Sequence, residues 1–306
     1  MRVVVMGAGG VGGYFGAKLA RAGEAVTFVA RGDHLKAIRA AGLRVMSATE
    51  GEIVVKSPAA DDLTGIGSVD LVLFCVKSYD TETASRAITP AVGSETVILS
   101  LQNGIDNEEK IQSLVGQGRV LGGAAYVFAT IEAPGVITHT SGGRIVFGEM
   151  DGEESERARE ILSAFQRAGV SATLSTNVRQ VLWEKFLLIT ALGGMTALTR
   201  CPVGVIRAIP ETRLMYRRIL EEVAALAKTA GIGIRPDAVE RALNMIDKLA
   251  PGEFSSLHYD LTHGKRLELE ALHGHAVRLG ERLGVPTPTL AAVYAALTPY
   301  LNGPPS

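Results

Sequence analysis

Residues 1–23 read MRVVVMGAGGVGGYFGAKLARAG, and most of the predicted fold follows from this stretch. Val3–Met6 is a short apolar, β-branched run, typical of strands that are buried on both faces of a parallel sheet. The glycine-rich segment Gly7–Gly12 comes directly after it, and Val11–Ala22 then has the composition of a helix. A strand, a glycine loop and a helix in this order predict the start of a βαβ unit.

The glycine loop has the pattern G-x-G-x-x-G, which binds dinucleotides when it lies between a strand and a helix. Gly7 allows the tight turn, Gly9 lets the backbone approach a pyrophosphate, and Gly12 lets the helix pack closely on the strand. The helix N-terminus adds N–H groups and the positive end of its dipole. We expect Gly7, Gly9, Gly10 and Gly12 to bind a dinucleotide; the alternative is a glycine-rich turn without a ligand.

The rest of the N-terminal half alternates apolar, β-branched runs with helical stretches. This alternation predicts an α/β domain of the Rossmann type, with a doubly wound, mostly parallel sheet. The expected strands are Ala25–Ala30, Leu71–Val76, Thr96–Leu101, Arg119–Ile131, Val136–Gly148 and Ser171–Leu174. The expected helices are His34–Ala41, Tyr79–Ile88 and Glu153–Ala168.

The pattern changes near Ser175, after which almost every segment is helical in character. Glycines and prolines separate these segments and mark their ends. The expected helices are Asn177–Thr199, Thr212–Gly231, Pro236–Leu249, Phe254–Leu283 and Thr289–Leu301. The sequence therefore predicts an α/β domain over residues 1–175 and an all-α domain over residues 176–306.

Composition argues against several other classes of protein. The chain has 31 basic and 32 acidic side chains, without the clustered basic excess of a nucleic-acid binder. The apolar stretch Phe186–Thr199 is shorter than the roughly 20 residues of a membrane-spanning helix. Met1 and Arg2 lead directly into a strand, without a signal-peptide pattern. Neither the histidines nor Cys75 and Cys201 have the spacing of metal ligands, so we expect no metal site. Two cysteines without a disulfide pattern are typical of a reducing compartment, so we expect a cytoplasmic protein.

Arg31 stands at the end of the second expected strand, and this position indicates the cofactor. NAD-binding folds usually place an acidic residue there to hold the ribose 2′-hydroxyl. A guanidinium suits a 2′-phosphate instead, because it can form two parallel hydrogen bonds with it. Asp33 lies close by and could weaken this preference, and Arg31 could also be a solvated loop residue. We expect NADP(H).

Lys77 and Asn103 follow the ends of two further expected strands. Ligands of open α/β sheets bind outside the carboxyl ends of the strands. We therefore expect both residues to contact cofactor or substrate, although Gln102–Gly104 could also form a simple turn.

Lys185 is surrounded by apolar residues at helical spacing, namely Leu182, Val181, Leu188 and Ile189. A lysine on an apolar stripe either extends its ammonium group to the surface or is buried for a purpose. Burial would lower the pKa of a lysine toward the range in which it can exchange a proton. The local pattern leaves both interpretations open.

A second polar row lies in the expected helix Phe254–Leu283. Ser256, Asp260, Gly264 and Glu268 recur every four residues, so one helix face would carry them all. Such a row is either a solvated face or a hydroxyl and carboxylates that face a cleft.

Together these motifs resemble the ketopantoate reductase family, over essentially the whole chain. The resemblance rests on the glycine loop and Arg31 together with the segments Val76-Lys77, Gln102-Asn103-Gly104, Leu182-Trp183-Glu184-Lys185, Cys201-Pro202-Val203-Gly204, Ser255-Ser256 through Glu268, and Gly284-Val285-Pro286. It implies an NADP-binding Rossmann domain, a helical substrate domain and an active site in the cleft between them. The implied reaction is the NADPH-dependent reduction of 2-dehydropantoate (ketopantoate) to pantoate, a step of pantothenate biosynthesis.

The resemblance also implies roles for single residues. The loop glycines and Arg31 would bind NADPH, with Lys77 and Asn103 close to the cofactor and the substrate. Lys185 would donate the proton to the 2-oxo group. The remaining implied residues are Ser256 at the substrate carboxylate, Asp260 behind it, and Glu268 beside the nicotinamide ribose and the catalytic lysine.

Three positions depart from the family pattern. The family commonly has asparagines four and eight residues beyond the catalytic lysine, where this chain has Ile189 and Gly193. A further family asparagine is Val203 here. The resemblance therefore implies a more apolar pocket and leaves room for another 2-oxo acid as substrate.

Two other classes of function stay open. One is an NADP(H)-sensing protein that has kept the fold and lost turnover, because fold does not determine function. The other is a hydroxy acid dehydrogenase of related two-domain architecture. The expected helix Phe254–Leu283 could also support a homodimer, although its apolar residues are equally explained by the core of the domain.

Overall fold

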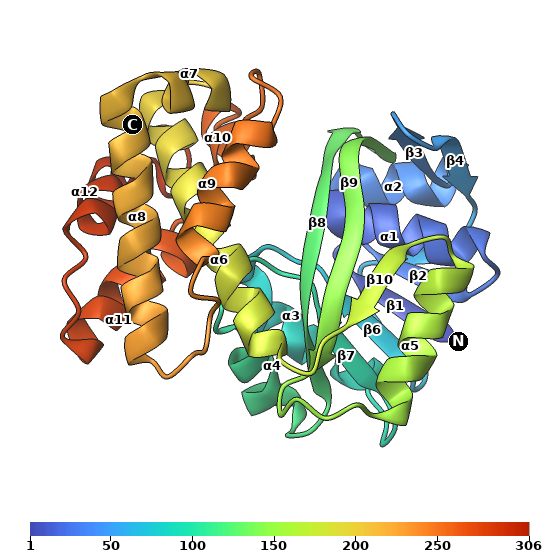
Figure 1. The fold of residues 1–306 in the computed structure, drawn as a ribbon. Helices are drawn as coiled ribbons and strands as arrows, with labels where there is room; N and C mark the ends of the chain where they lie inside the picture. Colours follow the sequence, from blue (N-terminus) through green and yellow to red (C-terminus); the bar gives the residue numbers. More distant parts are fainter. Residues whose placement is uncertain (306) are drawn as a thin grey trace. The chain divides into compact units, whose positions relative to one another are not determined.

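The computed structural model describes residues 1–305 and divides into two compact units (Figure 1). The first unit comprises Met1–Gln102 and Asp106–Val178. The second comprises Asn103–Ile105 and the chain from Arg179 onward. Each unit has its own hydrophobic core, and we describe each by itself.

The first unit is an α/β domain. Its strands are β1 (Arg2–Met6), β2 (Ala25–Val29), β3 (Leu43–Ser47), β4 (Gly51–Val55), β5 (Ala59–Ala60), β6 (Leu71–Phe74), β7 (Val97–Ser100), β8 (Val120–Ala133), β9 (Val136–Glu149) and β10 (Ser171–Leu174). Its helices are α1 (Gly10–Arg21), α2 (Gly32–Ala41), α3 (Thr81–Ala87), α4 (Asn107–Val115) and α5 (Glu156–Arg167), with short 3₁₀ turns at Ser78–Asp80 and Thr89–Ala91.

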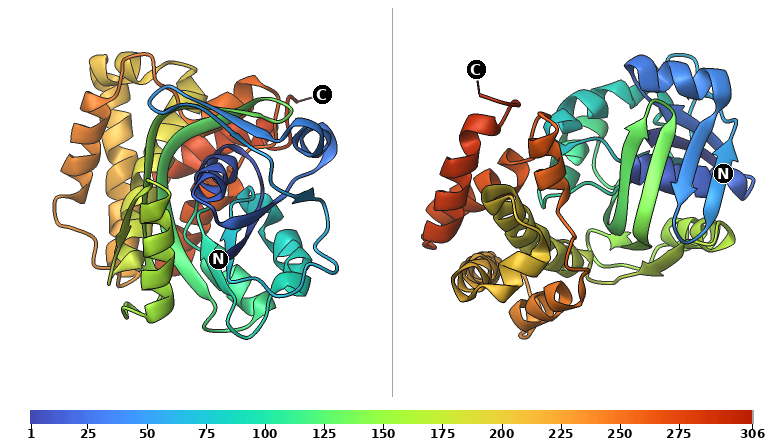
Figure 2. Two further views of the ribbon diagram at one scale, coloured as in Figure 1. Left: turned by 90° about the vertical axis from the view of Figure 1, so that its right-hand side faces the viewer. Right: turned by 90° about the horizontal axis from the view of Figure 1, so that it is seen from above.

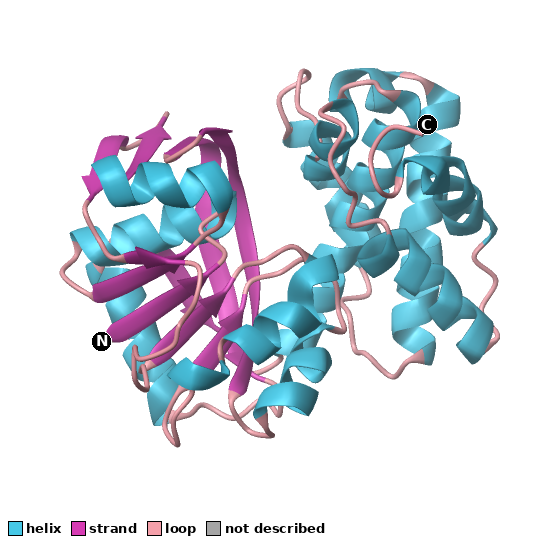
Figure 3. Cartoon of the chain, turned by 180° about the vertical axis from the view of Figure 1, so that it is seen from behind, coloured by secondary structure: helices cyan, strands magenta, loops and turns pink. Residues whose placement is uncertain are grey.

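The strands form one mostly parallel sheet in the order β4-β3-β9-β8-β7-β6-β1-β2-β5, and β10 pairs with β9. Antiparallel pairing occurs between β3 and β4 and between β8 and β9. Alternate residues of β1 enter different cores: Val3 and Val5 pack with α1 and α5, while Val4 and Met6 pack with α3 and α4. Helices thus cover both faces of the sheet, as Figure 3 shows, and the predicted doubly wound, mostly parallel fold is confirmed.

The antiparallel pair β8–β9 is the longest part of the sheet and runs as two adjacent green arrows in the right-hand view of Figure 2. It turns at its tip through Gly135, which has φ +78°. The tip is fixed to β3, because the N–H of Arg44 donates to the carbonyl of Gly135 at 2.9 Å. The hairpin end therefore lies beside α2 and β3, where the Cβ of Ala37 is 3.0 Å from the position that a Cβ on Gly135 would take.

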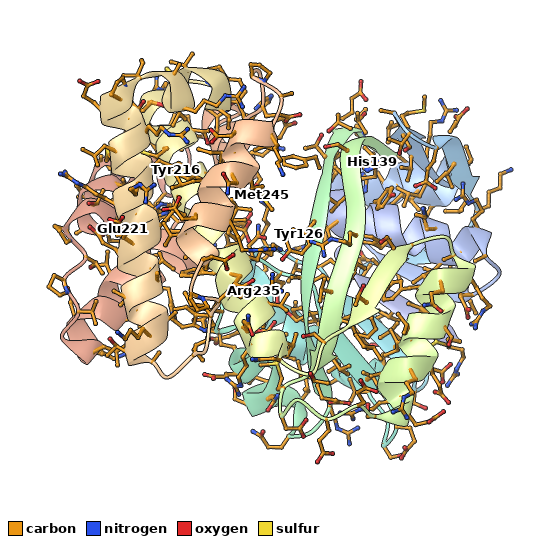
Figure 4. The ribbon with its side chains drawn as sticks, viewed as in Figure 1. Tyr126, His139, Tyr216, Glu221, Arg235 and Met245 are labelled. Carbon is orange, nitrogen blue, oxygen red and sulfur yellow. The ribbon has the colours of Figure 1, made fainter. Side chains whose placement is uncertain are left out.

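A partly buried polar cluster joins α1 to the β3–β4 turn. Glu50 accepts hydrogen bonds of 2.7 Å from Tyr14 and Lys18. Tyr14 stacks on His139, which Figure 4 labels on β9, with ring centroids 4.2 Å apart. The Nδ1 of His139 in turn lies 2.8 Å from the hydroxyl of Ser47. Burial lowers the pKa of His139, so its ring is neutral within this cluster.

The second unit is all-helical, as the cyan helices of Figure 3 show. Its helices are α6 (Val178–Thr199), α7 (Val203–Ala208), α8 (Pro210–Thr229), α9 (Ala238–Lys248), α10 (Ser256–Thr262), the π-helical turn Glu270–Gly274, α11 (His275–Leu283), α12 (Pro288–Leu297) and a 3₁₀ turn at Thr298–Tyr300. The predicted all-α character of this part of the chain is confirmed.

Helix α6 is the centre of the helical core. It is long and apolar enough to cross a membrane by length and composition, but 72% of its apolar window is buried inside the protein. Phe186, Ala191 and Met195 pack there against α8, α11 and α12. The burial explains the apolar sequence of α6 as that of a core helix.

The prediction of one continuous helix over Phe254–Leu283 is wrong. Helix α10 ends at Thr262, and Gly264 has φ +63°, a left-handed conformation that ends helices. The backbone N–H of Lys265 bonds back to the carbonyl of Asp260 at 2.8 Å and closes the end of the helix. Helical structure resumes only at the π-helical turn. The predicted polar row through Gly264 and Glu268 on one helix face is therefore wrong as well.

Other elements were not predicted. The strands β3, β4 and β5 and the helices α4 and α7 have no counterpart in the sequence prediction. Helix α7 is six residues long, and its position is fixed by Arg207, whose Nη1 donates to the carbonyls of Ile246, Asp247 and Leu249. These elements are short and depend on tertiary contacts more than on their own propensity.

Candidate active site

The glycine loop joins β1 to α1 in a tight turn that depends on glycine at several positions. Gly7 has φ +99°, which an L-residue rarely adopts. A Cβ on Gly12 would lie 2.2 Å from the carbonyl oxygen of Gly7, so only glycine lets α1 start this close to the loop. A Cβ on Gly10 would lie 2.0 Å from the carbonyl oxygen of Ala129 on β8. At Gly9, by contrast, no atom of the other described residues beyond its chain neighbours lies within 4 Å of that position, which leaves open space over the loop.

Arg31 lies at the carboxyl end of β2, as the N-cap residue of α2. Its side chain is 73% exposed, and its Nη2 donates to the carboxylate of Asp80 at 2.7 Å. Asp33, which could have opposed a phosphate at this edge, pairs with Lys36. Sequence analysis missed Asp80, although its position three residues after Lys77 places it at the same edge of the sheet.

Lys77 is half-buried and precedes the 3₁₀ turn that follows β6. Gln102 fixes this segment from the end of β7: its Nε2 donates to the carbonyl of Val76 at 3.0 Å and to the hydroxyl of Thr81 at 2.8 Å. Thr81 then donates to the side-chain oxygen of Asn107 at 3.0 Å. The loops after β6 and β7 are thereby held together at the carboxyl edge of the sheet. Sequence analysis considered Gln102 as a turn residue and as part of a family motif, and missed this role.

Asn103 follows Gln102 and is half-buried. The segment Asn103–Ile105 belongs with the helical unit, where Ile105 packs against its core. Thus, of the residues predicted to bind the cofactor, the loop glycines, Arg31 and Lys77 lie in the α/β unit.

Lys185 lies in the middle of α6 and is 7% exposed. Its neighbours Phe186 and Leu187 are part of the helical core. The sequence pattern was compatible with either an exposed or a buried side chain for Lys185, and the structure shows that it is buried. Glu268 is also buried, at 5% exposure, between Leu267 and Leu269 of the same core. Two ionisable side chains thus enter one apolar core, an environment in which charged groups are costly unless they are paired.

The face of α6 that carries Lys185 continues through Ile189 and Gly193 to Thr196 at helical spacing. Ile189 is half-buried and Gly193 is buried. Thr196 lies 2.6 Å from Ser255 by their hydroxyl oxygens, which ties the start of α10 to α6. A Cβ on Gly193 would lie 3.5 Å from Leu257 of α10. The surroundings of Gly193 are therefore apolar on the side of α10.

Ser256 and Asp260 lie one turn apart on α10 but differ in exposure. Ser256 is exposed in the first turn, and Asp260 is 5% exposed. The N-cap of α10 is Ser255, whose hydroxyl accepts from the N–H of His258 at 3.0 Å. The capping bond and the link to Thr196 fix the orientation of this helix start, and with it the position of Ser256.

Comparisons with known proteins agree with this arrangement. The family described as "Ketopantoate reductase PanE/ApbA" matches residues 3–152, and the family described as its C-terminal part matches residues 177–300. The 2-dehydropantoate 2-reductase of Halobacterium salinarum is 32% identical, with 95% of each chain covered. The "Uncharacterized oxidoreductase YkpB" of Bacillus subtilis is 30% identical, with 98% of this chain and 99% of the relative covered.

Among solved structures, a PanE/ApbA family ketopantoate reductase from Ralstonia eutropha is 35% identical and superposes with a TM-score of 0.91, with 98% of each chain covered. The resemblance that the sequence motifs indicated is confirmed over the length of both units. The chain therefore belongs to the ketopantoate reductase family.

Proposed function

We propose that this protein is an NADPH-dependent reductase of a 2-oxo acid, with ketopantoate as the first candidate substrate and Lys185 as the proton donor. The observation that carries the proposal is the burial of Lys185 in the middle of an apolar core helix, 7% exposed. A charged side chain in such a place costs stability, so a catalytic use explains its presence better than packing does. The name 2-dehydropantoate 2-reductase, borne by the Halobacterium salinarum relative, supports ketopantoate.

The bound cofactor would supply the hydride, which adds to the carbonyl carbon of the substrate. The carbonyl oxygen then gains negative charge, and the ammonium group of Lys185 stabilises this charge and gives up a proton to form the hydroxyl. Glu268, buried in the same core, would hold the protonated form of the lysine before the reaction. The Ser256 hydroxyl and the half-buried Lys77 and Asn103 would orient the substrate, with Asp260 behind Ser256.

NADPH is the preferred cofactor in this proposal because of the end of β2. Arg31 presents an exposed guanidinium there, and the acidic residue typical of NAD sites is absent from that position. The loop of Gly7, Gly9, Gly10 and Gly12 would take the pyrophosphate at the N-terminus of α1.

A different 2-oxo acid is the second candidate, and one observation favours it. The α6 face beyond Lys185 carries Ile189 and Gly193, and Leu257 lies against it. Val203, the third position that departs from the family pattern, is buried in the helical core. A pocket that offers apolar groups recognises the hydroxyl of ketopantoate poorly and an apolar side chain well.

The experiment is NADPH oxidation by the purified protein with ketopantoate and a panel of branched and aromatic 2-oxo acids. We expect turnover that Lys185→Ala abolishes, while Lys228→Ala, an exposed lysine of α8, leaves it unchanged. Turnover on another 2-oxo acid alone would assign the second candidate. Tight NADPH binding without turnover on any acid would contradict the enzyme and favour an NADP(H) sensor. Efficient oxidation of a hydroxy acid with NAD would instead indicate a dehydrogenase.

The cytoplasmic location, the absence of nucleic-acid and membrane partners, and a homodimer stay predictions from the sequence. Size-exclusion chromatography with light scattering tests the homodimer directly.

A further inference from the structure

His34 connects the dinucleotide loop to a distant part of the chain. It lies in the first turn of α2, three residues after Arg31. Its Nε2 is 2.8 Å from the carbonyl oxygen of Ala8, in the middle of the glycine loop. Its Nδ1 is 3.0 Å from the backbone nitrogen of Gly135, at the tip of the β8–β9 hairpin. One partly buried side chain thus contacts segments that are 26 and 101 residues away.

The two partners determine the protonation of the ring. The backbone N–H of Gly135 can only donate, so Nδ1 must be the unprotonated acceptor. The carbonyl of Ala8 can only accept, so Nε2 must carry the hydrogen and donate it. Both ring nitrogens of His34 are therefore satisfied by the backbone in a single neutral tautomer.

The bond to Ala8 fixes the direction of the next N–H. The Ala8–Gly9 peptide is planar and trans, so its C=O and its N–H point to opposite sides. Because the carbonyl of Ala8 is held by His34, the N–H of Gly9 points away from His34. Gly9 is also the position over which the structure leaves open space: among residues 1–305, none beyond its chain neighbours has an atom within 4 Å of where a Cβ would lie.

We propose that His34 is a positioning residue of the cofactor site, which holds the Ala8–Gly9 peptide so that the Gly9 N–H faces the pyrophosphate of the bound dinucleotide. The β8–β9 tip supports it by holding the ring in the required tautomer and orientation. The tip is itself fixed by the hydrogen bond from the N–H of Arg44 to the carbonyl of Gly135. This inference rests on the proposed function, since it presupposes a dinucleotide at the loop.

Substitution of His34 by Asn or by Gln tests its two hydrogen bonds, to Ala8 and to Gly135, one at a time. The carboxamide of His34→Asn takes the place of Nδ1, so it can still accept from Gly135 but does not reach Ala8. The longer side chain of His34→Gln brings its NH₂ to the place of Nε2, so it keeps the bond to Ala8. Each variant removes a polar ring and keeps at least one of the two bonds. The pair is thus matched for folding and differs in the contact with the loop.

The test is isothermal titration of both variants with NADPH, with thermal unfolding measured in parallel. We expect His34→Asn to raise the Kd by about tenfold, and His34→Gln by no more than about twofold, at similar unfolding temperatures. In turnover, the KM for NADPH should rise in His34→Asn while the KM for the 2-oxo acid stays unchanged. Equal NADPH affinity in the two variants would overturn the inference and leave His34 a purely structural link. If the unaltered protein binds neither NADPH nor NADH, the proposed function fails and this inference with it.

Discussion

The guanidinium of Arg31 and the carboxylate of Asp80 form an ion pair of 2.7 Å across the carboxyl edge of the sheet. Arg31 comes from the end of β2 and Asp80 from the 3₁₀ turn after β6. The ion pair keeps the exposed arginine at the place where the adenosine ribose of a dinucleotide is expected. It also places a negative charge beside the expected 2′-phosphate, so Asp80 competes with the phosphate for the same guanidinium.

Asp80→Asn should therefore strengthen NADPH binding and leave NADH binding unchanged. Two like charges near a solvated surface repel each other by on the order of 1 kcal/mol, so we expect an affinity gain of roughly fivefold. Arg31→Asp should erode the preference for NADPH over NADH. Titration of each variant with both cofactors measures these changes. Weaker NADPH binding by Asp80→Asn would show that Asp80 orients Arg31 and does not compete with the phosphate.

Neighbouring glycines of α6 should respond in opposite directions to alanine. A Cβ on Gly194 would lie 2.4 Å from Nε2 of the fully buried His273 and 3.0 Å from Val293, so Gly194→Ala should destabilise the protein by about 1–3 kcal/mol. A Cβ on Gly193 meets Leu257 at an ordinary 3.5 Å, so Gly193→Ala should stabilise the helix by up to about 1 kcal/mol. Urea unfolding of the two variants tests this contrast, and equal effects would contradict it.

The difference between predicted and observed helices has a clear physical basis. The helix α6 was predicted to within a residue of its observed ends, because its 22 residues are largely apolar and contain no proline, and its two glycines, Gly193 and Gly194, stay within the helix. The region Phe254–Leu283 was predicted as one helix, but Gly264 ends it. A glycine within a helical pattern is compatible both with a continuing helix and with a left-handed end. Only the tertiary environment distinguishes the two; here Pro304 lies 3.3 Å from the position that a Cβ on Gly264 would take.

Asparagines at positions 189 and 193 should move substrate preference toward ketopantoate. Ile189 and Gly193 lie four and eight residues after Lys185 on one face of α6, and Gly193 has room for a Cβ. Each new hydrogen bond to the substrate is worth about 0.5–1.5 kcal/mol, so the double variant should lower the KM for ketopantoate by roughly tenfold. The ratio of kcat/KM for ketopantoate and for an apolar 2-oxo acid is the measurement. An unchanged ratio would show that this face of α6 does not contact the substrate.

Glu50 should stabilise the α/β unit near neutral pH, and this stabilisation should be lost in acid as its carboxylate is protonated. Burial alone would raise the pKa of Glu50, but hydrogen bonds from Lys18 and Tyr14 outweigh it and lower the pKa to about 2. The pKa is thus lower in the folded protein than its ordinary value of 4.5, so the stabilisation is complete above pH 4.5 and is lost as the pH falls toward 2.

Glu50→Gln should accordingly destabilise the protein at pH 7, and the difference from the unaltered protein should shrink between pH 4.5 and pH 2. Urea unfolding at several pH values measures the free energy of unfolding of both proteins. Tyr14→Phe, which keeps the ion pair with Lys18 and removes one hydrogen bond, should weaken this pH dependence without abolishing it. A difference that stays constant with pH would contradict the role of Glu50.

The candidate site was only partly predictable from the sequence. The glycine loop was recognised because strand, glycines and helix are contiguous, and Arg31 because its distance from the loop is fixed by the βαβ unit. Asp80, Gln102 and His34 act through contacts between segments that are 21 to 101 residues apart. Such contacts depend on the order of strands in the sheet, which the sequence pattern of each segment does not encode.

The assignment of Asn103–Ile105 to the helical unit has a consequence for how the protein is made. The chain passes from one unit to the other after residues 102, 105 and 178, so no single cut separates them. During synthesis, the whole α/β unit leaves the ribosome before the helices that pack with the segment Asn103–Ile105 have been made. The helices against which Ile105 packs are translated more than 70 residues after it. An N-terminal fragment ending at Val178 should fold its sheet yet leave Ile105 without the apolar core of the helical unit, so limited proteolysis should cut this fragment more readily near Ile105 than it cuts the full chain.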